Sequence, residues 1–498
     1  MRIFAENCAF RILPECFSSN ITDMTLPRIF GYVALMCTLL FVSPNTYAQT
    51  LWSLEDCLQY GLANNLQIQQ GQLNVDLQRS NLIQARANQL PNLNASATHG
   101  VNTGRTIDPF TNTFATESVR SNNFGISGGL ILFNGLQVRN AINQAETNLE
   151  ANRHDVEKME NDMVLAITSG FLQILFAYEM LAVANGSHAL SLLQVERTRR
   201  LVEAGVLARG SLLSIEAQAA TDELQVVNAQ NRLDLAYLDL AQLLRIEDIQ
   251  NFRIRVPEIE VEDIEDVSYS PMQIFSFAVN NQPDIRSANL RIASAEYGLK
   301  IAKGARSPAL SFRGSYGTGY SGAIREITDI VVGSREIGIT AGGERVFGPA
   351  FDYVTRVKPF RNQLEDNLNR SISFVLTIPI LNNLQVNNSI SRARISLESA
   401  QINQQMVRDQ FFKSIQMAHA DAKAALKRYH STAKNVEALE EAFRYAAQKF
   451  ELGMVNSFEY NDAKNRLTFA KSEQVQAKFD FVFRTLVLDF YMGNPIAL

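Results

Sequence analysis

Cysteine, histidine and long apolar runs are all scarce in this sequence. Four cysteines occur in 498 residues, and three of them precede Ala48, which leaves Cys57. The five histidines are scattered, and no two have the spacing of metal ligands on one helix face. No phosphate-binding loop is present. The letters of Gly125-Ile-Ser-Gly-Gly129 match a hydrolase pattern, but no helix follows, so we interpret the match as chance. We therefore expect no catalytic site, no metal and no cofactor.

Basic charge is not in excess either. The net charge is −5, and nucleic-acid binding needs a basic face, so we expect no nucleic-acid partner. Apolar residues make up 46% and charged residues 19% of the chain. This composition can bury a large core and is not typical of a disordered chain.

The first 48 residues have the pattern of a secretory signal. Arg28 precedes an apolar run over residues 29–42, and small residues end at Ala48, where we expect cleavage. The run is short for a membrane span, although a membrane anchor is the alternative. Met24 is an alternative start, and the residues before Cys37 fit a lipid-anchor signal poorly. After Ala48 no apolar stretch approaches 18 residues in length, so we expect no transmembrane helix.

The remainder of the chain is a tandem duplication. Residues 131–138, Ile-Leu-Phe-Asn-Gly-Leu-Gln-Val, match residues 379–386, Pro-Ile-Leu-Asn-Asn-Leu-Gln-Val. Gly205 corresponds to Gly453 at the same distance from these motifs. We divide the chain into a signal peptide, a first repeat, an acidic linker, a second repeat and a tail, which cover residues 1–48, 49–247, 248–270, 271–491 and 492–498.

Each repeat predicts the same elements in the same order. A first helix spans Leu54–Gln89 or Pro271–Arg306 and ends before a proline. Two strands follow, then a helical run of about 68 residues to Gly205 or Gly453, and a last helix of about 35 residues. The alternative for the long run is a stack of shorter helices, with a break near residues 185–187.

Apolar residues alternate with small or polar ones in the predicted strands. In the second repeat, Phe312, Gly314 and Tyr316 alternate with Arg313 and Ser315. This pattern fits a membrane β-strand of about 10 residues, and the alternative is an ordinary half-buried sheet. The serine- and glycine-rich opposite face and the secretory signal favour the membrane. Four strands cannot close a barrel, so the membrane interpretation requires several copies of the chain.

Together, these motifs make residues 52–491 resemble the TolC family of outer-membrane efflux channels. The resemblance rests on the paired asparagines at 64–65 and 280–281, Pro-x-Leu at 91–93 and 308–310, Leu-Phe-Asn-Gly at 132–135, and the two glycine turns. It implies a mainly α fold with membrane β: duplicated long α-helical coiled-coil hairpins plus four β-strands per chain. Three chains would form a 12-stranded β-barrel in outer-membrane lipid above an α-helical periplasmic tunnel. The segment between residues 321 and 370 resembles a long extracellular loop.

The resemblance also implies roles for the two helix reversals. In the family such turns form the periplasmic tip that docks an adaptor protein, whereas simple helix reversal is the alternative. The corresponding residues here are Arg200, Leu201, Gly205, Val206, Leu207, Leu452, Gly453 and Met454.

A second implied site is an acidic gate. Glu459 and Asp462 match the family's acidic positions after the turn glycine, and residues three apart share a helix face. Three copies would form a ring of carboxylates that attracts cations. The alternative is a solvated helix face with Lys464 as a neighbour. Phe450 and Val455 occupy positions where some members lock the tip through a tyrosine and an arginine, so that lock is in doubt.

The resemblance therefore implies a passive homotrimeric channel rather than an enzyme. It would work in a tripartite efflux system with a periplasmic adaptor and an inner-membrane transporter of RND or ABC type. One alternative is the outer-membrane channel of a type I protein secretion system. Another is a structural coiled-coil protein with no channel.

Overall fold

The computed structural model describes the chain except residues 1–50, 108–111, 113, 116–117, 258–268 and 497–498. The predicted signal peptide therefore lies outside the described residues, as does part of the predicted linker. All of the described residues fall in one unit of the structure, Leu51–Leu498.

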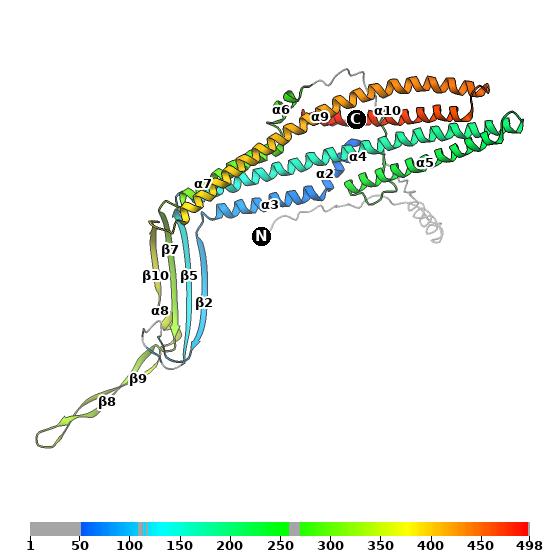
Figure 1. The fold of residues 1–498 in the computed structure, drawn as a ribbon. Coiled ribbons are helices and arrows are strands. Elements are labelled where there is room, and N and C mark those ends of the chain that lie inside the picture. The colour runs from blue at the N-terminus through cyan, green and yellow to red at the C-terminus, as the bar shows by residue number, and fades with distance from the viewer. Residues whose placement is uncertain (1–50, 108–111, 113, 116–117, 258–268, 497–498) are drawn as a thin grey trace, which may run out of the picture. The chain divides into compact units, whose positions relative to one another are not determined.

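The two halves contain the same series of long elements (Figure 1). The first half contains α2 (Leu54–Asn64), α3 (Leu66–Ala87), β2 (Asn92–Asn102), β5 (Val119–Phe133), α4 (Gln137–Glu203) and α5 (Arg209–Leu244). The second contains α6 (Pro271–Ala278), α7 (Pro283–Gly304), β7 (Ala309–Ser321), β10 (Asn369–Thr377), α9 (Gln385–Glu451) and α10 (Ser457–Tyr491). The long helices α4 and α9 each have 67 residues, so each extends about 100 Å. Neither is a stack of shorter helices, and α4 passes through residues 185–187 without a break.

The prediction of one continuous first helix in each half is wrong. In the first half the chain is extended at Asn65, and its side-chain Oδ1 accepts hydrogen bonds from the backbone N–H groups of Gln67 (2.8 Å) and Ile68 (3.1 Å). Asn65 thus caps a new helix, as asparagine often does. In the second half Pro283 occupies the first turn of α7, where its missing N–H costs nothing.

The four predicted strands form one antiparallel sheet in the order β10-β7-β5-β2. Paired residues share a face, so the register places Phe312 opposite Phe374 on one face and Arg313 opposite Ser373 on the other. The apolar face is exposed to solvent in the single chain. Its exposed residues include Leu93, Ile126, Tyr316, Ile372, Phe374 and Leu376.

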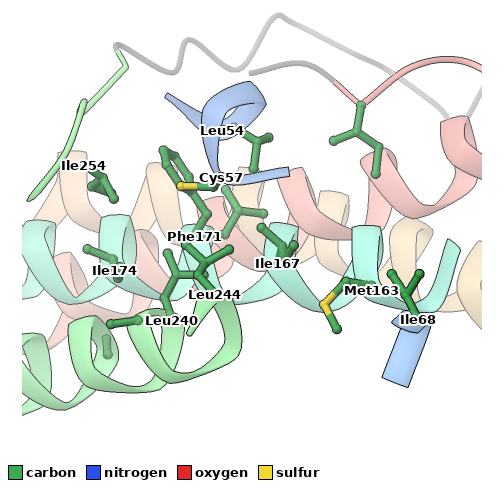
Figure 2. Close-up of a cluster of buried hydrophobic side chains, with 14 of the residues drawn as sticks. Leu54, Cys57, Ile68, Met163, Ile167, Phe171, Ile174, Leu240, Leu244 and Ile254 are labelled. Atoms are coloured by element: carbon green, nitrogen blue, oxygen red, sulfur yellow. The ribbon is translucent and has the colours of Figure 1, made fainter. Parts of the chain in front are cut away.

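The main core lies where α2, α4 and α5 meet, and Figure 2 shows its central side chains. Ile167, Phe171 and Ile174 of α4 pack there with Leu240 and Leu244 of α5. By length and composition, α4 is the only helix among the described residues that is apolar enough to cross a membrane. A core helix can be equally long and apolar, and α4 contributes to this core, so the expectation of no transmembrane helix stays a prediction.

Part of the predicted linker also belongs to this core. The short strand β6 (Arg253–Ile254) pairs in parallel with β1 (Leu51–Trp52). Phe252 and Ile254 are buried, and the Phe252 ring lies edge-on to the Trp52 ring at 5.7 Å. Residues 252–254 therefore help to hold the start of the first half against α4 and α5.

The segment expected to be a long loop contains regular structure. Strands β8 (Arg325–Ile339) and β9 (Arg345–Val357) form an antiparallel hairpin, and the short helix α8 (Phe360–Asp366) follows. A smaller hairpin of β3 (Thr106–Ile107) and β4 (Phe114–Ala115) lies between β2 and β5.

Candidate functional site at the helix reversals

Both long helices end in the same kind of turn. Gly205 has φ +73° and Gly453 has φ +68°, a left-handed conformation that favours glycine. In each turn the residue after the glycine donates its backbone N–H back to the end of the helix: Val206 to Leu201 O at 2.8 Å, and Met454 to Lys449 O at 2.9 Å. The sequence therefore places a tight reversal at each glycine, as predicted.

The predicted docking residues differ in exposure. Val206 is 67% exposed, Leu452 75% and Met454 69%, which are high values for large apolar side chains. Arg200 is exposed and pairs with Glu196 on its own helix. The remaining apolar residues of the set, Leu201 and Leu207, are half-buried.

The two reversals lie at the same end of the helices (Figure 1). An ion pair joins them, because Arg197 of α4 lies 2.6 Å from Glu451 of α9. A second link joins α5 to α10, where the Gln218 side-chain amide donates to Asn465 at 3.2 Å. The chain therefore brings both predicted turns into one region.

The predicted acidic pair lies at the start of α10. Glu459 and Asp462 are both exposed. Asn456 caps this helix by accepting the backbone N–H of Glu459 at 3.0 Å, and a carboxylate in the first helical turn is favourable. Asp462 pairs with Arg466 at 2.9 Å, whereas Glu459 has no ion-pair partner among the described residues. Glu459 is thus the less compensated of the two charges.

Lys464 is not a solvated neighbour of this pair, contrary to the alternative interpretation. Its side chain is only 1% exposed and donates to Asp222 of α5 and to Ser191 of α4. The side-chain amide of Gln218 donates to the same Asp222 carboxylate at 2.9 Å. One buried cation therefore connects three helices near the reversals.

A signal for this buried pair was present in the sequence. Ile215, Ala219 and Asp222 follow the spacing of the buried stripe on α5, and Lys464 lies in the stripe between Tyr460 and Leu467 on α10. Opposite charges at core positions of two adjacent helices indicate a partner, because an unpaired buried charge is very costly.

The two positions at which the resemblance implies a polar lock, Phe450 and Val455, carry apolar side chains. Phe450 is buried, and its ring lies 5.2 Å from that of Tyr460. The ring of Phe443, which like Phe450 belongs to α9, lies 5.5 Å from the same Tyr460 ring of α10. Burial raises the pKa of the Tyr460 hydroxyl above its ordinary value. Aromatic packing therefore occupies this site.

A sequence model of the outer membrane efflux protein family matches residues 58–244 and 275–494. These two segments make up most of the chain and fall in its two halves. The chain belongs to this family.

Known members of the outer membrane efflux protein family support the assignment. The efflux protein BepC of Brucella suis is 20% identical over 436 residues, which cover 88% of this chain and 84% of BepC. The structure of CusC has a TM-score of 0.72 at 14% identity, with 89% of this chain and 92% of CusC covered. The CmeC outer membrane channel of Campylobacter jejuni has a TM-score of 0.71 at 14% identity, with 88% and 85% covered. The fold of this efflux protein is thus that of outer-membrane channels.

Among the described residues, no group of three or more His, Cys, Asp or Glu side chains could hold a metal ion. Ser127 of the Gly-x-Ser-x-Gly match lies within β5, which continues to Phe133. This position lacks the turn into a helix that a nucleophilic serine needs.

Proposed function

We propose that this chain is the outer-membrane channel of a tripartite efflux system and conducts substrates passively. The observation that carries the proposal is the four-stranded sheet with an exposed apolar face. A soluble sheet would bury such a face, whereas lipid would cover it favourably. The opposite face, with Asn94, Ser127, Arg313 and Ser315, suits a water-filled lumen.

The sheet also supports assembly into a homotrimer. Strands β2 and β10 are its two edges, and neither has an outer partner among the strands that the structure describes. Unpaired backbone groups are not tolerated in lipid, so β10 of one copy would pair with β2 of the next. Three copies would close a barrel of twelve strands.

The helices offer matching surfaces for the same assembly. Leu66, Leu73 and Leu77 are exposed on α3, and their spacings of seven and four residues recur on α9 at Ile395, Ile402 and Met406. Leu73 points away from the buried Val75, since residues two positions apart on an α-helix are separated by about 200° around its axis. Each helix thus has a second apolar stripe on which a helix of a neighbouring copy could pack as in a coiled coil.

The tunnel would end at the reversals, in the periplasm. Exposed Val206, Leu452 and Met454 would give a periplasmic adaptor an apolar contact, and the adaptor would link the channel to an inner-membrane transporter of RND or ABC type. Glu459 and Asp462 from three copies would surround the entrance and favour cations.

The experiment is to purify the mature chain and to measure its native mass and its conductance in planar bilayers. A trimer that forms discrete channels is expected. Leu73→Glu should dissociate the trimer, while Asn74→Glu, one residue away, should not. A stable monomer that never conducts would overturn the proposal. Loss of polypeptide export, rather than of small-molecule efflux, in a deletion strain would favour the type I secretion alternative.

A further inference from the structure

The hairpin of β8 and β9 has two different faces. Register places Ile330 opposite Tyr353 and Val332 opposite Phe351. Residues two apart share a face, so one face is apolar along most of its length. We call it the apolar hairpin face: Ile327, Ile330, Val332, Ile339, Phe347, Phe351, Tyr353 and Val357. The other face carries charges, among them Glu326, Asp329, Arg335, Asp352 and Arg356.

All eight side chains of the apolar hairpin face are exposed in the single chain. An isolated two-stranded hairpin is marginally stable in water, and exposed apolar patches of this size indicate an interaction. Among the described strands, β8 and β9 pair only with each other. The hairpin therefore lacks the partner that its composition requires.

We propose that the apolar hairpin faces of three copies of this chain pack against one another and form a collar at the outer end of the barrel. This inference rests on the proposed trimer. Each hairpin follows the end of β7 farther from the helices, and its base is tied down by hydrogen bonds from Lys358 N to Ile324 O (2.9 Å) and from Ser321 N to Gln363 Oε1 (2.9 Å). A closed barrel would repeat this anchor three times around one rim and so give a high local concentration.

The charges of the hairpin favour copies of the same chain over lipid. Between residues 325 and 357 the hairpin carries four basic and five acidic side chains. These charges nearly cancel, so the electrostatic repulsion between three hairpins would be small. Arg325, Glu336 and Arg345 lie on the same side as the apolar hairpin face, near its two ends, and Arg345 pairs with Glu336 at 3.6 Å. Charged groups are costly in hydrocarbon but not at the ends of a protein interface.

Two adjacent valines of β8 provide the test. Val332 lies on the apolar hairpin face, and Val331 lies on the charged face, and both are exposed. Purified trimers of Val332→Cys and of Val331→Cys would be oxidised, and covalent dimers would be measured. We expect about tenfold more dimer for Val332→Cys, because alternate residues point to opposite faces. The native mass of the same sample reports on the trimer separately.

Two outcomes would overturn the collar while leaving the channel proposal intact. One is an intact trimer in which both variants cross-link equally or not at all. The other is quenching, by nitroxide-labelled lipid, of a fluorophore attached at position 332 but not at 331, which would place the apolar hairpin face in the membrane. A sample that is not trimeric would instead count against the proposed function.

Discussion

Replacing Lys464 by methionine tests the energetic role of the buried cation. The Lys464 and Asp222 side chains are each only 1% exposed, so removing the ammonium group leaves a carboxylate in the core with Ser191 and Gln218 as its remaining partners. Breaking a buried pair in this way costs about 3–5 kcal/mol. We expect Lys464→Met to lower the free energy of unfolding by this amount for each chain.

A matched control lies one heptad further along α10. Lys471 pairs with Glu440 at 2.7 Å, but both side chains are 40–50% exposed, and such pairs contribute about 0–1 kcal/mol. The assay is urea unfolding of the protein in detergent, monitored by circular dichroism. The double variant Asp222→Leu/Lys464→Met should recover most of the loss, since no charge is left buried. The reasoning is refuted if Lys464→Met costs no more than Lys471→Met.

The loss should also be local. Lys464 lies about three helical turns from Gly453, and it connects α10 to α4 and α5. We therefore expect limited proteolysis of Lys464→Met to begin at the helix reversals, at denaturant concentrations where the sheet remains intact.

Three further predictions concern the proposed gate, the turns and the thiol. In bilayers, Glu459→Gln should reduce cation selectivity more than Asp462→Asn, because Asp462 is already paired; equal effects would contradict this ordering. Gly453→Ala should destabilise the protein by about 1–2 kcal/mol because the new side chain must adopt a positive φ, whereas Gly210→Ala, within a helix, should be neutral or stabilising; thermal unfolding separates them. Burial, with a smaller contribution from the adjacent carboxylate, raises the pKa of the Cys57 thiol from 9.0 to about 12. Iodoacetamide should therefore label unfolded chains readily above pH 9 but label folded protein only as the pH approaches 12; fast labelling of folded protein at pH 9 would argue against burial. By linkage, the same shift lowers stability as the pH rises from about 9 to 12.

The long helices and the four sheet strands were predictable because their patterns are periodic. The stripe of α9 and the alternation of β7 extend over many residues, so single exceptions do not hide them. The break at Asn65 was missed because the apolar pattern continues across it, while one side chain supplies the cap. The hairpin was missed for a different reason. Register shifts after Ile327 and Glu336 each displace the alternation by one residue, and this hides a period of two.

The candidate site was predicted in part. The turn glycines at 205 and 453 were identifiable because a tight reversal needs a positive φ, which few other residues adopt. The alternative that placed Lys464 on a solvated helix face was wrong, because it rested on the charge of the residue alone. Its place in the buried stripe of α10 carried more information than its residue type. The proposed gate depends on neighbouring copies, so its support comes from the exposure of Glu459 and Asp462.

The equal length of α4 and α9 constrains how this protein can vary. Both helices start beside one sheet and have 67 residues, which brings the ends of the two halves to one level. Inserting seven residues in α4 alone would move the reversal at Gly205 about 10 Å farther from the sheet than the reversal at Gly453. Arg197 would then be separated from Glu451. Viable length variants should therefore carry compensating insertions or deletions in both halves, so the length of the helical hairpins can change only in paired steps.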